Sequence, residues 1–303
     1  MNDRLSIDIC VCTFRRDHIV TTLQSLAKLD VAANWDVRII VADNDDTASA
    51  EIKVKAVSSS IRIPIIYLHA PARNISVARN ACLDATSADY IAFIDDDETA
   101  PRQWLKELIH TAETEKSAAV LGPVDPAFAE GYPSWMVKGQ FHATRPVWVN
   151  GSIITGYTCN LLLDRHAPQF QNLRFRTELG RTGGEDTVFL STINNRGGKI
   201  SYAERSLLIE PVPEGRASLS WLMKRRFRSG QTHAILILES QQDNIATRIK
   251  NIIIASCKLA VCMVMTVLHL PLPVQSISWL LRGCIHCGVI ARLTGKKELV
   301  QYG

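Results

Sequence analysis

The sequence predicts an α/β protein whose central sheet is mostly parallel and is covered by helices on both faces. Short apolar runs alternate with helix-like segments through the first 125 residues. The runs are continuously apolar, which is typical of strands that are buried on both faces. Strands that are joined through helices form crossover connections and lie parallel. The chain has 303 residues, of which 47% are hydrophobic, so it can bury a substantial core.

Five strands and four helices are expected in this first part of the chain. The first helix is indicated by Ile19, Leu23 and Leu26, which share one helical face. Pro101 marks the start of the fourth helix, because proline is favoured in the first helical turn. The expected strands are 6–13, 37–45, 63–70, 90–98 and 118–124, and the later helices lie near 47–57, 76–85 and 104–113.

Acidic residues cluster where two of these strands end. Asp43 and Asp45 close the second strand, and Asp95, Asp96 and Asp97 close the fourth. Ligands of open α/β sheets bind outside the carboxyl ends of the strands, so we expect the acids to line a site. Asp43 or Asp45 is a candidate for binding the base or a ribose hydroxyl of a nucleotide. A simple Asn-Asp turn is the structural alternative.

Four adjacent acids, from Asp95 to Glu98, follow the fourth strand directly. On an extended segment the carboxylates of Asp95 and Asp97 point to the same side and can converge on one cation. Mg²⁺ or Mn²⁺ bound to a nucleoside diphosphate suits such an oxygen-rich site. A solvated loop with a helix-capping aspartate before Pro101 is the alternative.

The same acids allow a second enzymatic interpretation. Asp95-x-Asp97-x-Thr99 matches the signature of haloacid-dehalogenase-type phosphatases, in which the first aspartate is the nucleophile. Those enzymes usually place the motif on their first core strand, whereas here it follows three strand–helix units. No later acidic pair after an apolar strand completes such a metal site. The phosphatase is therefore the alternative enzyme.

The middle of the chain, 126–185, is rich in glycine, proline and aromatic residues and is predicted to form loops with a few strands, which shape a substrate pocket. A Gly-Gly pair precedes Glu185 and Asp186, which open a helix. The helix dipole favours acids at this position, which is a structural role. The functional role would be a base that takes the proton of an acceptor hydroxyl. Asn160 is a candidate for binding that acceptor, or part of a turn.

Taken as a set, the motifs resemble the family 2 glycosyltransferases, which have the GT-A fold. CTFRR follows the first strand, VADND the second, ISVARN opens a helix, and FIDDDE follows the fourth strand. GYTCNLLL, GGEDTVF and RRFRSG come later and also fit. The resemblance covers about residues 5–235, and more narrowly it is to the bacterial succinoglycan and exopolysaccharide glucosyltransferases. Asn74 and Cys82 depart from positions where this family often has glycine.

The resemblance implies a role for each motif residue. Asp95 and Asp97 would be the carboxylates that hold the metal, Mg²⁺ or Mn²⁺. Asp186 would be the catalytic base, with Glu185 in support or as the alternative base. Nucleotide binding is implied for a set of residues that follow the first, second and fourth strands or lie in ISVARN. These residues are Thr13, Arg15, Asp43, Asp45, Arg79 and Asp96.

Basic residues concentrate in the last part of the chain. From Arg216 to Gly303 there are 12 Lys and Arg against 3 Asp and Glu, whereas the first 215 residues have 22 against 27. This asymmetry indicates an anionic partner, either phosphates or a lipid surface. In KRRFRSG, Arg225 and Arg228 share a helical face and are candidates for binding the departing diphosphate. A solvated basic face or a lipid contact is the alternative.

Two apolar segments, 252–273 and 277–293, follow. Lys258, Arg282 and His286 interrupt them, so an interfacial helical hairpin fits better than two membrane spans. Core helices or a dimer interface are the alternatives. The expected domains are a glycosyltransferase domain, 1–240, with a nucleotide-sugar half, 1–125, and an acceptor half, 126–240, followed by a membrane-associating segment, 241–303.

The compartment is expected to be the cytoplasmic face of the inner membrane, with the protein bound peripherally. The N-terminus has no apolar region with a cleavage site, so no secretory signal is expected. The eight cysteines are scattered, as reduced thiols are. A metal or redox role for Cys284 and Cys287 is the alternative.

The expected function is the inverting transfer of a hexose from a nucleoside diphosphate sugar to a growing glycan. The resemblance implies UDP-glucose as donor and a polyprenyl-diphosphate-linked oligosaccharide as acceptor. Nucleic acid is not an expected partner. Two alternatives are a phosphatase with Asp95 as nucleophile and a non-catalytic nucleotide-sugar-binding protein.

Overall fold

The computed structural model of this protein describes residues 4–240 and 244–298. The described chain divides into two compact units, which we call the sheet unit and the helical unit. The sheet unit comprises residues 4–125 and 144–210, and the helical unit comprises residues 126–143 and 211–298.

This division differs from the domain boundary that the sequence predicts between residues 240 and 241. Residues 211–240, which we expected in the acceptor half, belong to the helical unit together with the apolar C-terminal segments. Residues 241–243 and 299–303 of the predicted membrane-associating segment lie outside the described residues, as do residues 1–3.

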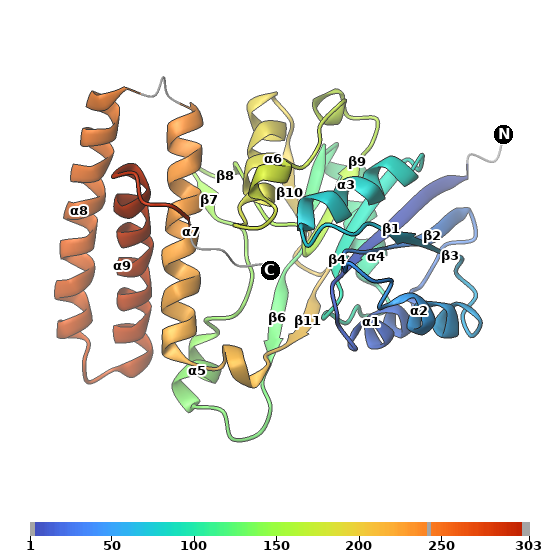
Figure 1. Ribbon diagram of the computed structural model, residues 1–303, viewed down its shortest axis with the longest axis horizontal. Coiled ribbons are helices and arrows are strands. Elements are labelled where there is room, and N and C mark those ends of the chain that lie inside the picture. The colour runs from blue at the N-terminus through green and yellow to red at the C-terminus, as the bar shows by residue number, and fades with distance from the viewer. Residues whose placement is uncertain (1–3, 241–243, 299–303) are drawn as a thin grey trace. The chain divides into compact units, whose positions relative to one another are not determined.

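A seven-stranded sheet forms the centre of the sheet unit (Figure 1). Its strands follow the order β10-β5-β9-β4-β1-β2-β3. β9 runs antiparallel to both of its neighbours, and the other neighbouring pairs are parallel. The strands are β1 (Leu5–Thr13), β2 (Trp35–Asp43), β3 (Ile65–His69), β4 (Tyr90–Asp95), β5 (Ala119–Leu121), β9 (Asn160–Asp164) and β10 (Ile200–Tyr202). The prediction of a mostly parallel sheet is confirmed.

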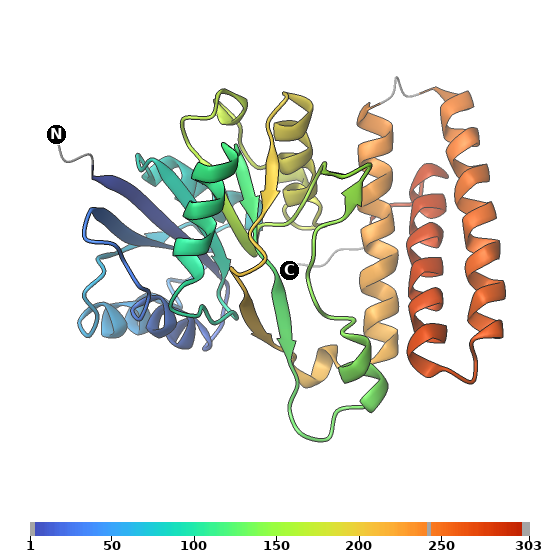
Figure 2. The ribbon, with the colours of Figure 1, turned by 180° about the vertical axis from the view of Figure 1, so that it is seen from behind.

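Helices cover both faces of this sheet (Figures 1 and 2). One core joins α1, α2 and α4 to side chains such as Ile9 and Ile39, and the other joins α3 and α6 to side chains such as Cys10 and Ile40. Consecutive residues of one strand thus enter opposite cores, as the pleat requires. The helices are α1 (Ile19–Leu26), α2 (Glu51–Ser58), α3 (Ile75–Ala85), α4 (Trp104–Glu115) and α6 (Glu185–Asn195).

Two strands of the sheet, β9 and β10, are not among the five expected in the first part of the chain. β9 lies in the stretch 126–185, where loops with a few strands are predicted, and β10 lies in a segment for which no strand is predicted. β9 inserts between β4 and β5, so Leu161 pairs with both Phe93 and Leu121. Such an insertion depends on contacts between distant segments, which local periodicity does not report. Shorter elements complete the chain: β6 (Val124–Ala127), β7 (Trp148–Val149), β8 (Ser152–Ile153), β11 (Leu208–Pro211), and the 3₁₀ helices η1 (Pro168–Phe170), η2 (Thr177–Leu179) and η3 (Glu214–Arg216).

The helical unit is built from four helices, α5 (Ser134–Gly139), α7 (Leu219–Ser240), α8 (Ile245–Leu268) and α9 (Pro273–Leu293). α9 packs against both α7 and α8, as Figures 1 and 2 show. Two glycines bring α7 and α9 together: a methyl group at Gly230 would overlap the carbonyl oxygen of Ile285, and one at Gly288 would overlap that of Phe227. This close crossing explains why α7 belongs with the C-terminal helices.

Candidate active site at the carboxyl ends of the strands

The acid turn, Asp95–Glu98, begins at the last residue of β4. The Glu98 carboxylate accepts a hydrogen bond from the Asp95 backbone N–H at 2.9 Å, which closes the turn. Thr22 of α1 donates its hydroxyl to the carbonyl oxygens of Asp96, at 3.0 Å, and Glu98, at 2.8 Å. The turn is therefore held from within and from the neighbouring helix.

Asp96 is turned into the protein. Its Oδ2 accepts a hydrogen bond from the hydroxyl of Thr13, at the end of β1, at 2.6 Å. Burial, followed by the negative charge of Asp97, raises the pKa of Asp96 to about 7, although the Thr13 hydrogen bond acts in the opposite direction. The structure thus brings together two residues for which nucleotide binding was predicted, and here they bind each other.

Asp95 is the acid in this turn that lacks a partner: its half-buried carboxylate makes no hydrogen bond or ion pair with another described residue. Burial, and then the negative charges of Asp97, Glu210 and Asp186, raise its pKa to about 6, while Arg79 lowers it. A carboxylate among other acids, without a donor of its own, has a favourable place for a cation beside it.

The residues present fit a metal that is shared with a ligand. Within residues 4–240 and 244–298, no group of three or more His, Cys, Asp or Glu side chains is arranged to hold a metal by itself. Asp95 and Asp97 supply hard oxygen ligands, and Mg²⁺ or Mn²⁺ commonly completes its shell with water and phosphate oxygens. These two acids therefore could hold the cation once a diphosphate is bound, and the metal remains a prediction.

Arg16 was missed by the sequence analysis, although it contacts the acid turn. Its Nη1 lies 2.9 Å from Oδ2 of Asp97, and its Nε lies 3.7 Å from Oδ1 of Asp96. The adjacent arginines of CTFRR were the available signal, but the motif predicts a role for Arg15 alone. The Arg16 guanidinium therefore lies against the carboxylates at the place where a metal-bound phosphate is expected.

A small pocket of about 160 Å³ opens beside Arg16 and is lined by Arg15, Arg16, Ser49, Ala50 and Lys53. Three cationic side chains around so small a volume are suited to phosphate oxygens, because guanidinium and ammonium groups donate charged hydrogen bonds to them. Lys53, on α2, gave no motif from which its position could have been predicted.

Arg15 and Asp45 form an ion pair at the entrance of this region. Nη2 and Nε of Arg15 lie 2.8 and 2.9 Å from Oδ1 of Asp45. The hydrogen bond from Arg15 holds the pKa of Asp45 well below its usual range. The side chain of Arg15 is more than half exposed, so its remaining donors face solvent.

Asp43 is completely buried at the end of β2. Its Oδ2 accepts hydrogen bonds from the Ala50 backbone N–H and from the Tyr67 hydroxyl, both at 2.8 Å, and its Oδ1 accepts one from the Asp45 N–H at 3.1 Å. Burial and the hydrogen bond to Asp43 raise the pKa of Tyr67. The carboxylate is thus occupied by the protein, and its contact with a base stays a prediction.

Arg79 on α3 and Glu185 at the start of α6 form a buried ion pair, with side chains 7% and 3% exposed. The Arg79 guanidinium also lies over the ring of Phe175, 5.5 Å from its centroid. Arg79 was expected at the nucleotide and Glu185 at the base. Their pairing ties the start of α6 to α3, so both side chains are placed to position the site.

Asp186 is only half-buried, unlike Glu185. Its Oδ1 accepts a hydrogen bond from the Thr187 N–H at 2.6 Å, and its Oδ2 accepts none from the residues that the structure describes. Gly183 and Gly184 have φ of 82° and 96°, which glycine adopts without strain. This reversal sets the start of α6, and Asp186 is close enough for its charge to raise the pKa of Asp95.

Asn160 has a structural role in the sheet unit. The side chain is fully buried at the start of β9. Its Oδ1 accepts from Trp104 Nε1 at 2.9 Å, and its Nδ2 donates to the carbonyl oxygens of Pro123, at 2.9 Å, and Ser206, at 2.6 Å. Both donor hydrogens are used within the protein, and the predicted contact with an acceptor stays a prediction. Asn160 holds three distant segments together.

Arg225 and Arg228 lie on α7 of the helical unit. The Arg225 guanidinium is 5.4 Å from the centroid of the Trp221 ring. The diphosphate-binding role of the two arginines stays a prediction.

Comparison with known proteins gives relatives along the whole chain. Residues 8–169 match the family model described as Glycosyl transferase family 2. The chain is 46% identical over 302 residues to the succinoglycan biosynthesis protein ExoM of Rhizobium meliloti (strain 1021), covering 100% of this chain and 97% of that relative. It is 21% identical over 252 residues to a glucosyl-dolichyl phosphate glucuronosyltransferase of Haloferax volcanii, covering 77% and 78% of the two chains.

Among solved structures, S. aureus TarS 1-349 in complex with UDP-GlcNAc is similar with a TM-score of 0.54 at 17% identity. The similarity covers 96% of this chain and 93% of that chain. At this identity the likeness concerns the fold, and it confirms the GT-A type that the sequence predicts.

Proposed function

Because this chain belongs to glycosyl transferase family 2, we propose that it transfers a hexose, with inversion, from a nucleoside diphosphate sugar to a lipid-linked oligosaccharide in exopolysaccharide biosynthesis. The observation that carries this proposal is one continuous arrangement in the sheet unit. The acid turn with its unpartnered Asp95 adjoins a pocket lined by three cations, and Arg16 contacts both. Such a pairing of acids and cations suits a diphosphate bound together with a divalent metal.

On the donor side, Arg15, Arg16 and Lys53 would bind the diphosphate oxygens. Arg16 would then exchange part of its contact with Asp97 for the phosphate. A divalent cation on Asp95 and Asp97 would act as a Lewis acid that stabilises the charge of the leaving diphosphate. Thr13 and the backbone of the acid turn keep these groups in place.

On the acceptor side, Asp186 would be the base. As the acceptor hydroxyl oxygen bonds to the anomeric carbon, the bond from that carbon to the diphosphate oxygen breaks, and the hydroxyl proton goes to Asp186. One displacement inverts the anomeric centre. Asp186 is favoured over Glu185 because it is more exposed, whereas Glu185 is tied to Arg79 in a buried ion pair.

For the donor we propose UDP-glucose. A UDP-sugar is supported by the TarS complex with UDP-GlcNAc. The lipid-linked acceptor is supported by the name of the Haloferax relative, which contains a dolichyl phosphate, and by α8 and α9, which are both long and apolar enough to cross a membrane by length and composition. We propose that they bind the cytoplasmic membrane face peripherally.

The experiment is incubation of the purified protein with radiolabelled UDP-sugars, Mn²⁺ or Mg²⁺, and a lipid extract of an exopolysaccharide-producing bacterium. Label in the lipid fraction, greatest with UDP-glucose and lost with a chelator, is expected. Release of phosphate from simple monoesters would instead favour the phosphatase with Asp95 as nucleophile. Tight UDP-sugar binding without either reaction would favour a binding protein and overturn the proposal.

A further inference from the structure

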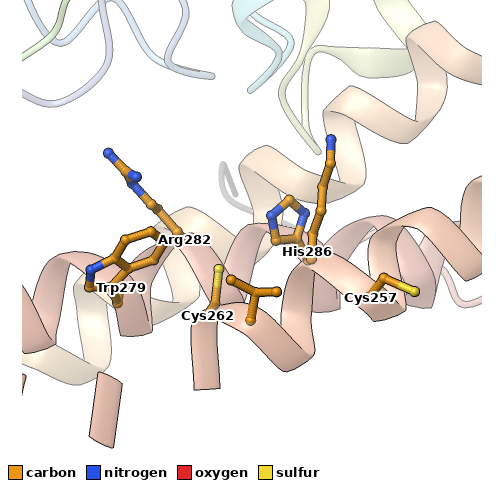
Figure 3. A pocket seen from close by; sticks show the side chains of 7 residues that line it. Cys257, Cys262, Trp279, Arg282 and His286 are labelled. Carbon is orange, nitrogen blue, oxygen red and sulfur yellow. The ribbon is translucent and has the colours of Figure 1, made fainter. Parts of the chain in front are cut away.

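The helical unit contains its own pocket, of about 320 Å³, between α8 and α9. Figure 3 shows that Arg282 and His286 project from α9 to the same side, with Trp279 beside Arg282 and Cys262 of α8 facing them. Lys258 and Val261 of α8 also line the pocket. This pocket is larger than the pocket of about 160 Å³ beside Arg16, and its lining residues come from a part of the chain that is distant in sequence from the acid turn.

The pocket is cationic and has no acid to balance it. Residues 244–297 include seven Lys and Arg residues and no Asp or Glu. Lys258 and Arg282 are both exposed, and neither forms an ion pair with another described residue. The Arg282 guanidinium lies 5.0 Å from the centroid of the Trp279 ring, which orients it without neutralising it. An anionic ligand is what this charge pattern favours.

The surroundings of the pocket are apolar and exposed. Only 11% of the most apolar 18-residue stretch of α8 is buried within the protein, whereas 39% of the corresponding stretch of α9 is buried. Exposed apolar side chains of α8 include Ile253, Val261, Val264 and Val267, which are 57%, 56%, 58% and 62% exposed. Val261 belongs both to this apolar face and to the pocket. A contiguous apolar face of this kind marks a site of lipid or protein interaction.

We infer that the pocket between α8 and α9 binds the diphosphate end of an isoprenoid lipid, whose hydrocarbon chain lies along the exposed face of α8. Lys258 and Arg282 donate to the phosphate oxygens, and His286, which also lines the pocket, is a further donor. Two unpaired cations match a diphosphate better than the single phosphodiester of a glycerophospholipid. The inference rests on the proposed function, since it names where the carrier of the acceptor glycan is held.

The test uses the full-length protein and vesicles of phosphatidylcholine that contain either a long-chain polyprenyl diphosphate or phosphatidylglycerol at matched total charge. The variant is K258Q/R282Q. The control is K250Q/K296Q, which removes the same charge from exposed lysines outside the pocket. Circular dichroism and UDP binding are measured on both variants, so that a folding defect or a failed donor site is recognised separately.

Wild-type protein should bind the polyprenyl diphosphate vesicles more tightly than the phosphatidylglycerol vesicles. K258Q/R282Q should lose roughly tenfold or more of that affinity, and K250Q/K296Q should lose much less. Equal losses in the two variants, or no preference for the diphosphate lipid, would mean a general surface attraction and overturn the inference.

Two further outcomes would also overturn it. Inorganic diphosphate that displaces the protein from vesicles as effectively as the lipid does would make this a site for a free anion. A protein that ignores all vesicles and sediments as a dimer would show that a second copy covers α8. In either case retained UDP binding would leave the proposed function standing, whereas loss of UDP binding with intact lipid binding would contradict the function and not the pocket.

Discussion

The sheet unit and the helical unit differ in how their charged side chains are arranged. In the sheet unit, acids gather at the strand ends and cations lie against them, as Arg16 does with Asp97 and Arg15 with Asp45. In the helical unit, cations such as Lys258 and Arg282 stand in apolar surroundings without any acid on α8 or α9. This contrast agrees with the two proposals made above, a divalent cation bound with a diphosphate in the sheet unit and a lipid anion bound in the helical unit. Variants in each unit should therefore have separable effects.

The largest effect is expected from Asp186→Asn. The fold and the cationic pocket remain, while the proposed proton acceptor is lost, so glycosyl transfer should fall by roughly 10²–10⁴-fold. UDP binding by calorimetry and vesicle binding should stay unchanged. Asp84→Asn, at an exposed acid of α3 in the same unit, is the control and should transfer normally. If Asp186→Asn turns over at close to the wild-type rate, another residue is the base, and Glu185 would be tested next.

Asp97→Asn should reduce Mn²⁺-dependent UDP binding to the level seen without metal, a loss of roughly tenfold or more, because a hard cation loses a charged oxygen ligand. Calorimetric titration of UDP with and without Mn²⁺ measures this loss. Asp46→Asn removes a more exposed acid after β2 and should bind normally. If Mn²⁺ still strengthens UDP binding in Asp97→Asn as it does in the wild type, the acid turn is not the metal site.

Gly288→Ala should destabilise the helical unit by about 1–3 kcal/mol, because its methyl group meets the backbone of α7 and the helices must separate. Gly283→Ala is a matched control on the same helix, since its methyl group would lie 3.4 Å from Leu259 and 3.5 Å from Cys262, in ordinary contact. Hydrogen exchange should quicken in α7 and α9 of Gly288→Ala alone. Unchanged exchange there would contradict the close crossing of α7 and α9.

The smallest effect concerns Asp89, before β4. Its carboxylate accepts hydrogen bonds from the Ser6 N–H at 2.8 Å and the Ser6 hydroxyl at 2.6 Å, and it contacts His166 Nε2 at 2.8 Å. Burial raises the pKa of Asp89, but these contacts outweigh it and lower the pKa to about 2. A depressed carboxyl pKa gives stability that is present above about pH 4 and lost as the pH falls toward 2.

Asp89→Asn should therefore lower the stability of the sheet unit by about 1 kcal/mol at neutral pH, since the pair is partly solvent-screened. The difference from wild type should vanish near pH 2. Urea unfolding at several pH values measures it, with Asp84→Asn again as the control. A difference that does not change with pH would mean that packing, and not the ionised carboxylate, is responsible.

The sequence alone determined the alternation of β1 to β5 with their helices and the placement of acids after β2 and β4. Continuous apolar runs report burial on both faces, and the residues that follow such a run must lie at the sheet edge. The glycines before Glu185 and Asp186 likewise predicted the start of a helix, because glycine allows the local backbone reversal. These features depend on neighbours in the chain, so they can be predicted without the fold.

Which side chains contact one another depends on the tertiary structure. Arg79 and Glu185 are 106 residues apart in the chain, and their ion pair forms because α3 and α6 share one face of the sheet. The insertion of β9 between β4 and β5 buries Asn160, and its amide then bonds to segments that are distant in the chain. Gly230 and Gly288 unite α7 with α9 only when the two helices cross. Each of these contacts depends on packing between distant segments, which a local pattern of apolar and polar residues cannot predict.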